Sequence, residues 1–390
     1  MKLMELIMKN DKFRSNCLNL IASENTLSPQ VKKALSIQHS RYHSDFYGGS
    51  NVFQKIYAQS QELAEKVFHC KSALISPLSG NMAVLAVMLA HSHPEDKIAI
   101  LPLHPAGGYP INLEFFGRKR INIPWSPKEY NIDLSRTIEI LEVEKPPLVF
   151  LGASLFLFPH PVKPIADVVH GYGGLVAYDG SHVLGLIAGG QFQDPLGESA
   201  DFLLGSTHKS FPGPQGGVIL ANDFALDNLN EVIGLDPLKG IVLVDNVHNS
   251  RIAALGVALE EFQHYGVQYA MQTTLNAKAL AQTLDEHEIS LHGREKGFTE
   301  SHQVLMQIED FTQGARYRDM LLKYKLVTDS AMRFGTAELT RQGFKVPEME
   351  ILGRIISELI HHASRDEEPS SIQLKEIVNS IDKLIKRQTL

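Results

Sequence analysis

The sequence is poor in cysteine, has no basic excess and contains no long apolar run. Its 390 residues include two cysteines, Cys17 and Cys70, which are too few for a disulfide framework and form no CxxC metal pair. Lysine and arginine total 37 against 44 aspartates and glutamates, which gives a formal net charge of -7. A dedicated binder of nucleic acid or of an anionic membrane needs the opposite balance. We therefore expect neither kind of partner.

Targeting and metal signals are also missing. No apolar stretch approaches the roughly 18 residues that a membrane-spanning helix needs. The opening MKLMELIMKN places charges among its apolar residues and lacks the apolar core of a signal peptide. Together with the scarcity of cysteine, this predicts a cytoplasmic protein. The histidine pairs at 91/93 and 361/362 lack the spacing of a zinc site, so no metal is expected.

Short apolar segments alternate with helical patterns through the middle of the chain. The run LVFLGAS at 148–154 is continuously apolar, as in strands buried on both faces of a parallel sheet. Further strands are expected at residues 72–76, 97–101, 174–179, 202–205 and 217–221. This alternation predicts an α/β fold with a mostly parallel sheet.

The helical patterns suggest how the chain is divided. Helices are expected at 28–38, with Ser28 as N-cap and Pro29 in the first turn, at 81–90, at 249–286 with an interruption near Tyr265 and Gly266, and at 370–387. We expect an N-terminal arm (1–45), a large domain (46–248), a linking helix (249–287) and a small α+β C-terminal domain (288–390).

The residues with the clearest chemistry follow two of the predicted strands. Asp179 ends one strand and Lys209 follows the next, and the carboxyl ends of such strands are where ligands gather. Pyridoxal phosphate needs a lysine amine to form a Schiff base with its aldehyde, and a carboxylate to keep its ring nitrogen protonated. Each residue alone is common in α/β proteins, as a surface lysine or a turn-capping aspartate. Their order, with Ser206, His208 and the turn GPQGG nearby, predicts this cofactor.

A phosphate site is expected at Ser79 and Gly80. These residues directly precede the predicted helix 81–90. Backbone N–H groups at a helix N-terminus bind phosphate without a basic side chain.

Several motifs together resemble the serine hydroxymethyltransferase family of fold type I pyridoxal-phosphate enzymes over nearly the whole chain. They are LIASEN at 20–25, YGG at 47–49, PLSG at 77–80, DGSHVLGLIAGG at 179–190, STHKSFPGPQGG at 206–217 and MRFGTAELTRQGF at 332–344. The resemblance implies a large domain with a mostly parallel sheet, a smaller C-terminal domain, an amino-acid substrate and a homodimer with a shared active site.

The resemblance also implies roles for individual residues. Lys209 corresponds to the Schiff-base lysine and Asp179 to the partner of the ring nitrogen. The other implied cofactor contacts are Ser79, Gly80, Ser206, Ser154, His182, Tyr42 and Tyr109, the last in place of a stacking histidine. Ser23, Tyr47 and Arg333 correspond to substrate-binding residues. The candidates for the catalytic acid or base are His182, His208, Tyr47 and Asp45, with His43 as a further candidate base.

Two departures from the family pattern count against tetrahydrofolate as a co-substrate. Only four residues separate Tyr42 from Tyr47, and the catalytic glutamate that the family carries there has no counterpart. The segment 325–329, where the family has a longer folate-binding loop, is also short. Three activities are therefore left open. The first is the family's cleavage or formation of the Cα–Cβ bond of a serine-type 3-hydroxy amino acid. The others are a folate-independent aldolase or transaldolase acting on another such amino acid, and another pyridoxal-phosphate reaction on an amino acid. A silent binding protein is disfavoured by the intact Asp179, Lys209 and Arg333.

Overall fold

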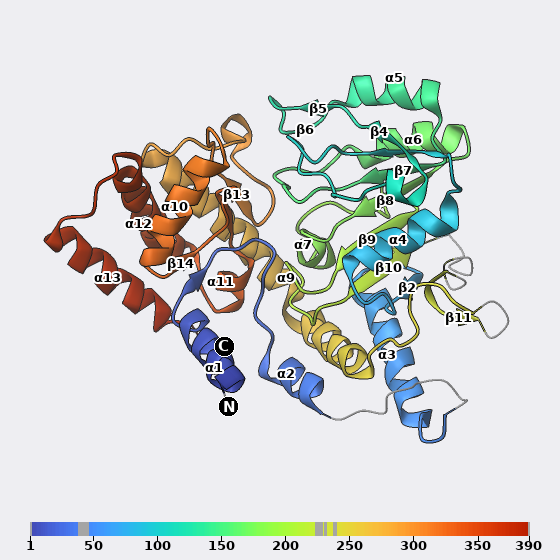
Figure 1. Cartoon of the computed structure of the whole chain (residues 1–390), viewed down its shortest axis with the longest axis horizontal. Helices are drawn as coiled ribbons and strands as arrows, with labels where there is room; N and C mark the ends of the chain where they lie inside the picture. Colours follow the sequence, from blue (N-terminus) through green and yellow to red (C-terminus); the bar gives the residue numbers. More distant parts are fainter. Residues whose placement is uncertain (1, 38–46, 223–228, 230–231, 237–239, 389–390) are drawn as a thin grey trace. The chain divides into compact units, whose positions relative to one another are not determined.

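The computed structural model describes residues 2–37, 47–222, 229, 232–236 and 240–388. The chain divides into two compact units (Figure 1). We call residues 27–270 the sheet unit, and residues 1–26 together with 271–390 the terminal unit. The four-part division expected from the sequence stays a prediction. No helix in the described ranges is both long and apolar enough to cross a membrane.

A seven-stranded sheet forms the centre of the sheet unit, in the order β2-β10-β9-β8-β7-β3-β4. The pairs from β9 to β4 are parallel, whereas β10 runs antiparallel to both β2 and β9. The strands are β2 (Ser72–Leu74), β3 (Lys97–Ile100), β4 (Lys119–Asn122), β7 (Leu148–Leu151), β8 (Leu175–Asp179), β9 (Phe202–Ser206) and β10 (Gly217–Ala221). The mostly parallel sheet predicted from the sequence is confirmed.

Helices cover the apolar strands. β7 and β9 are buried along their whole lengths, which requires packed elements on both faces of the sheet. Helix α4 packs on β9 and β10, α6 on β8 and α3 on β2. The charged sequence KRIN of β4 suits its edge position, because charged side chains discourage pairing with another chain.

The sheet unit also contains several helices and short strand pairs. They are α2 (Pro29–Ser36), α3 (Asn51–Val67), α4 (Gly80–His91), η1 (Glu114–Phe116), β5 (Trp125–Ser126), β6 (Asn131–Ile132), α5 (Leu134–Glu144), α6 (Val162–Gly171), α7 (Leu184–Ala188), β11 (Leu235–Asp236), β12 (Gly240–Ile241) and the first part of α9 (Asn249–Glu286). The predicted cap of α2 is confirmed, since Ser28 Oγ accepts a hydrogen bond of 3.1 Å from Val31 N and Pro29 is the first helical residue.

The interruption expected in the long helix is wrong, because α9 is continuous from Asn249 to Glu286. Gly266 lies within the helix, and a Cβ there would lie 2.3 Å from Cε1 of Phe262. A Cβ on Gly189 would lie 2.7 Å from the carbonyl oxygen of Gly266, so α9 passes very near Gly189. The ring of Tyr265 packs edge-on against Phe262 and Tyr269, one turn away on either side.

The terminal unit combines helices with two small sheets. Its elements are α1 (Lys2–Arg14), β1 (Leu18–Asn19), η2 (Arg294–Lys296), β13 (Gln303–Leu305), α10 (Phe311–Lys323), β14 (Leu326–Val327), β15 (Arg333–Gly335), α11 (Ala337–Arg341), α12 (Val346–Ser364), α13 (Ser371–Ile385) and the end of α9. Strand β1 pairs in parallel with β14, and β13 pairs antiparallel with β15. The fully buried Leu18 and Leu20 join its apolar core, so residues near the N-terminus are part of this unit's fold.

Candidate active site

Two neighbouring strands bring the predicted cofactor residues together. Asp179 is the last residue of β8 and Ser206 the last of β9, and these strands pair in parallel with Asp179 opposite Leu204. Asp179 Oδ1 accepts a hydrogen bond of 2.9 Å from the backbone N of Ser181. Lys209 follows three residues after β9 and is half-buried. A carboxylate and an amine therefore follow the carboxyl ends of two neighbouring strands, as the parallel arrangement predicts.

Ser79 and Gly80 form the start of α4 beside this edge. Ser79 Oγ accepts from Met82 N at 3.2 Å and caps the helix. A Cβ on Gly80 would lie 2.4 Å from Ser206 Oγ and 3.2 Å from Ser181 Oγ. Ser206 N in turn donates to Ser181 Oγ at 3.0 Å. We call these four residues the phosphate cradle, because they combine hydroxyls with the free N–H groups of a helix N-terminus.

Ser181 was not among the residues predicted from the sequence. It lies two positions after Asp179 within the motif DGSH, and that proximity was the available signal. Its hydroxyl bonds to Ser206, which no local pattern reveals because the two residues lie on different loops.

Tyr109 lies within electrostatic reach of Asp179. Burial, and secondly the negative charge of Asp179, raise the pKa of Tyr109 to about 12. Its hydroxyl donates to Asn81 Oδ1 in the first turn of α4. Ser154 N donates to the carbonyl of Gly107 at 2.7 Å, which holds the Tyr109 loop against the segment after β7. Tyr109 thus places a neutral aromatic side chain within electrostatic reach of the Asp179 carboxylate.

His208 and the turn after Lys209 form the next part of the site. Burial, and secondly the charge of Lys209, lower the pKa of His208, so the imidazole stays neutral near neutral pH. Its Nδ1 is buried and has no hydrogen-bond partner in the structure. Thr207 N donates to the carbonyl of Gly216 at 3.1 Å, and Thr207 Oγ1 donates to that of Pro214 at 2.6 Å, so the turn folds back on the lysine segment. His182, 5 % exposed, belongs to the same unit.

Ser23 and Arg333 are brought together within the terminal unit. Ile21 forms a bridge with Phe334, and a Cβ on Gly335 would lie only 2.4 Å from the Cα of Ala22. The segments that carry the two predicted carboxylate-binding residues are therefore packed side by side.

Asp329 holds the guanidinium of Arg333. Arg333 Nε and Nη2 lie 3.1 and 3.0 Å from Asp329 Oδ2. Asp329 Oδ1 accepts from the backbone N of Ala331 at 3.1 Å, so its carboxylate is itself oriented. Asp329 was not predicted as a site residue, and its i,i+4 spacing from Arg333 was the missed signal.

Of the four remaining predicted residues, the structure describes only Tyr47. Tyr47 is 41 % exposed at the start of the turn before α3. Tyr42, His43 and Asp45 lie outside the described residues.

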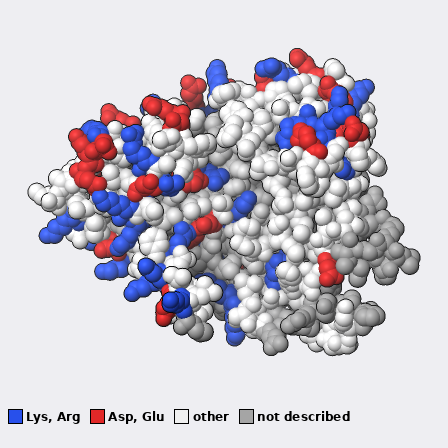
Figure 2. All heavy atoms as spheres, in the orientation of Figure 1, with Lys and Arg blue, Asp and Glu red and all other residues white. Residues whose placement is uncertain are grey.

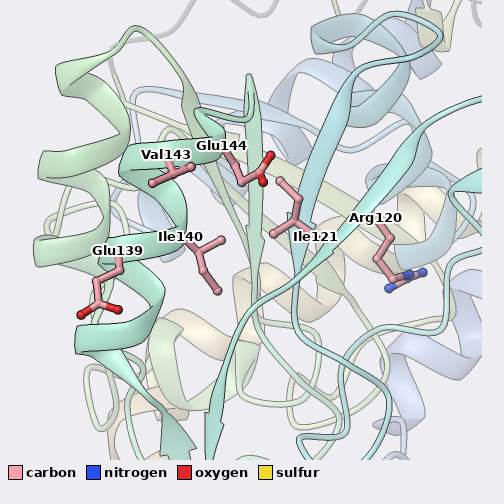
Figure 3. Close-up of a pocket in the computed structure, with 6 residues that line it drawn as sticks. All are labelled: Arg120, Ile121, Glu139, Ile140, Val143 and Glu144. Carbon is pink, nitrogen blue, oxygen red and sulfur yellow. The ribbon is translucent and has the colours of Figure 1, made fainter.

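A separate cavity of about 450 Å³ lies between α5 and the edge strand β4 (Figure 3). It is lined by Arg120, Ile121, Glu139, Ile140, Val143 and Glu144, none of them a predicted site residue. Figure 2 shows basic and acidic side chains intermixed on this part of the surface. Two ion pairs involve residues of this cavity or their chain neighbours, Lys97–Glu144 and Lys119–Glu95.

The sheet and the Asp179, Ser206 and Lys209 arrangement define the class of fold type I pyridoxal-phosphate enzymes. A solved L-threonine transaldolase from Pseudomonas fluorescens, in its internal aldimine state, is similar to the chain with a TM-score of 0.86 and 25% identity. The match covers 99% of this chain and 91% of that chain. The predicted fold class and the predicted cofactor are confirmed.

The sequence comparisons identify the family within that class. The profile of the serine hydroxymethyltransferase family matches residues 1–356. The serine hydroxymethyltransferase of Methanopyrus kandleri is 36% identical over 379 residues, covering 91% of this chain and 87% of that protein. That of Methanobrevibacter smithii is 37% identical over 403 residues, covering 96% and 93%. The chain belongs to the serine hydroxymethyltransferase family.

Proposed function

We propose that the protein cleaves or forms the Cα–Cβ bond of a 3-hydroxy amino acid of the serine/glycine type, with pyridoxal phosphate as cofactor. The observation that carries this proposal is the grouping of Asp179, Ser206 and the Lys209 segment beside the N-terminus of α4. The relatives named serine hydroxymethyltransferase support the same reaction class.

The residues of the sheet unit suit each part of the cofactor. The phosphate cradle offers hydroxyls and helix N–H groups to a phosphate. Asp179 would hold the proton on the ring nitrogen, Tyr109 would stack on the ring, Ser154 would contact the ring hydroxyl and Lys209 would bind the aldehyde. When bound, the cofactor supplies an electron sink for the pair left on Cα after a bond to it breaks.

The residues of the terminal unit suit the substrate carboxylate. Arg333, oriented by Asp329, presents a planar guanidinium that can bind a carboxylate through two parallel hydrogen bonds. Ser23 and Tyr47 would add hydroxyl contacts, and Tyr42 a contact to the cofactor.

A base must remove the proton of the substrate hydroxyl when the Cα–Cβ bond breaks. His208 is suited to accept it because its lowered pKa leaves it unprotonated near neutral pH. His182, Tyr47, Asp45 and His43 remain the alternatives that the sequence offers.

A folate-independent transaldolase or aldolase acting on a larger 3-hydroxy amino acid is the second candidate. The similarity to the L-threonine transaldolase over 99% of the chain supports it. The absence of a glutamate between Tyr42 and Tyr47 supports it too. In either case we propose a cytoplasmic homodimer with a shared active site. Light scattering of the active enzyme at assay concentration tests the oligomeric state, and a monomer would contradict the proposal.

A panel of amino acids tests the proposed function. Purified protein is mixed with pyridoxal phosphate, its visible absorbance is recorded, and glycine, L-serine, L-threonine and larger 3-hydroxy amino acids are added in turn. We expect a spectral change with glycine, and release of aldehyde and glycine from at least one 3-hydroxy amino acid. A protein that binds the cofactor but releases aldehyde from none of them would overturn the proposal.

A further inference from the structure

Arg251, near the start of α9, is a buried arginine without a carboxylate partner. The residue is 6 % exposed and forms no ion pair with any acidic side chain that the structure describes. Its Nη2 donates to the carbonyls of Ile75, Ser76 and Val247 at 3.0, 3.1 and 3.0 Å. Its Nη1 is buried and has no hydrogen-bond partner among the residues that the structure describes. The side chain thus joins two segments and leaves one donor group unsatisfied.

The unsatisfied end of Arg251 faces the turn that follows Lys209. A Cβ on Gly216 would lie 2.7 Å from Nη1. The next residue, Gly217, packs directly on the phosphate cradle, because its own Cβ would lie 2.3 Å from the carbonyl oxygen of Ser79 and 3.0 Å from Gly80 N. Gly217 N also donates to the carbonyl of Pro77 at 2.9 Å. Arg251 therefore contacts both chain segments that shape the start of α4.

Within the described part of the sheet unit, no acidic side chain forms an ion pair with Arg251. Burial lowers the pKa of Arg251 to about 10, so the guanidinium is charged near neutral pH. Tyr57 of α3 interacts electrostatically with Arg251, but burial raises the pKa of Tyr57, so that phenol is neutral near neutral pH. A buried cation without a counter-charge is costly to the folded protein unless an anion binds nearby.

We propose that Arg251 is a positioning residue for the cofactor phosphate. It holds the carbonyls of Ile75 and Ser76 and packs against Gly216 beside the N-terminus of α4, and its positive charge favours a dianion in the cradle. Weak screening in the protein interior lets that charge act over several ångströms. The inference rests on the proposed function, since it presumes that the cradle binds the phosphate of pyridoxal phosphate.

Binding of pyridoxal phosphate is compared with binding of pyridoxal, which has the same ring and aldehyde but no phosphate. Both are titrated into the full-length apoprotein and followed by absorbance. For Arg251→Met we expect pyridoxal phosphate to bind about 10- to 100-fold more weakly, while pyridoxal binding changes less than about twofold. Arg251→Lys keeps the charge but not the three carbonyl bonds, and we expect an intermediate loss.

Arg118→Met is the matched control. Arg118 is 7 % exposed, and its guanidinium also bonds to backbone carbonyls, those of Ser92 and Phe116 at 2.6 Å each, but away from the cradle. Its loss should lower the unfolding temperature without changing the preference for the phosphorylated ligand.

The outcomes separate the two proposals. If Arg251→Met weakens both ligands equally, or neither, the positioning role is wrong. If that variant does not fold, Arg251→Lys provides the test. An unchanged ratio of the affinities for pyridoxal phosphate and pyridoxal in Arg251→Lys would overturn the positioning role. If the wild-type protein binds neither ligand, the proposed function itself fails.

Discussion

Replacement of Gly152 by alanine should disturb Asp179 through the backbone. Gly152 follows β7 with φ of +106°, a conformation that side chains rarely adopt. A Cβ there would lie 2.2 Å from the carbonyl oxygen of Asp179 and 2.9 Å from its N. Since a carbon normally approaches a carbonyl oxygen to about 3.3–3.6 Å, the end of β8 would have to move by about 1 Å.

The expected cost has two parts. The positive φ costs about 1–2 kcal/mol for a residue with a Cβ. The overpacking against Asp179 adds about 1–3 kcal/mol. Gly173→Ala isolates the first part, because Gly173 has φ of +84° and no atom within 4 Å of its Cβ position. The difference between the two variants therefore measures the clash at Asp179.

Urea unfolding of the apoprotein and titration with pyridoxal phosphate test this reasoning. We expect Gly152→Ala to be less stable than Gly173→Ala by about 1–3 kcal/mol. We also expect it to bind the cofactor at least about tenfold more weakly, because a shift of the carboxylate loses charge-assisted bonding to the ring nitrogen. Equal stability of the two variants, or wild-type cofactor affinity in Gly152→Ala, would refute the argument.

Four further predictions address other residues. Lys209→Ala should abolish the yellow absorbance of the bound cofactor and most turnover, and a wild-type protein that stays colourless with added cofactor would contradict the assignment. Arg333→Lys should lower kcat/KM by about 30- to 1,000-fold, because an ammonium cannot reproduce the planar grip, and a change below about threefold would place the carboxylate elsewhere. Glycine formation from a 3-hydroxy amino acid should proceed without tetrahydrofolate, whereas a preference for L-serine with a rate that rises by orders of magnitude on adding folate would restore the family reaction. His160 is 3 % exposed, and burial lowers its pKa to about 3. Below the ordinary pKa of histidine, His160 is therefore protonated in the unfolded chain but stays neutral in the folded one. Stability should thus fall by about 2 kcal/mol between pH 7 and 5 on its account, and urea unfolding of His160→Phe at both pH values should show a smaller fall than the wild type.

The sequence was most informative where local pattern determines geometry. Asp179 and Lys209 could be placed at one edge because parallel strands present their carboxyl ends together. A helix was expected at 81–90, and α4 begins one residue earlier, at Gly80, where the hydroxyl of Ser79 caps the first turn. Both predictions needed only the pattern of apolar residues over a few positions.

Contacts between distant segments could not be predicted in this way. Arg251 donates a hydrogen bond to the carbonyl of Ile75, 176 positions away in the sequence, and the residues next to either one do not predict this contact. The edge strand β4 was missed because its sequence KRIN is charged, and its place comes from pairing with β3. Tyr265 and Gly266 suggested a break in α9, but the helix is continuous, and Gly189 of a distant segment packs closely against it at Gly266.

The burial of α4 has a consequence for how such a site responds to its surroundings. Six of its residues, from Gly80 to Met88, are buried, and the helix packs on β9 and β10 within the protein interior. Mobile ions screen charges within about a Debye length in solution, but they do not enter a packed interior. The proposed attraction for a phosphate comes from buried groups, namely the backbone N–H groups at the start of α4 and the guanidinium of Arg251. Neither the salt concentration nor evolutionary change of the surface charges should therefore alter it much. The outer surface is free to change its charge while the site keeps its affinity.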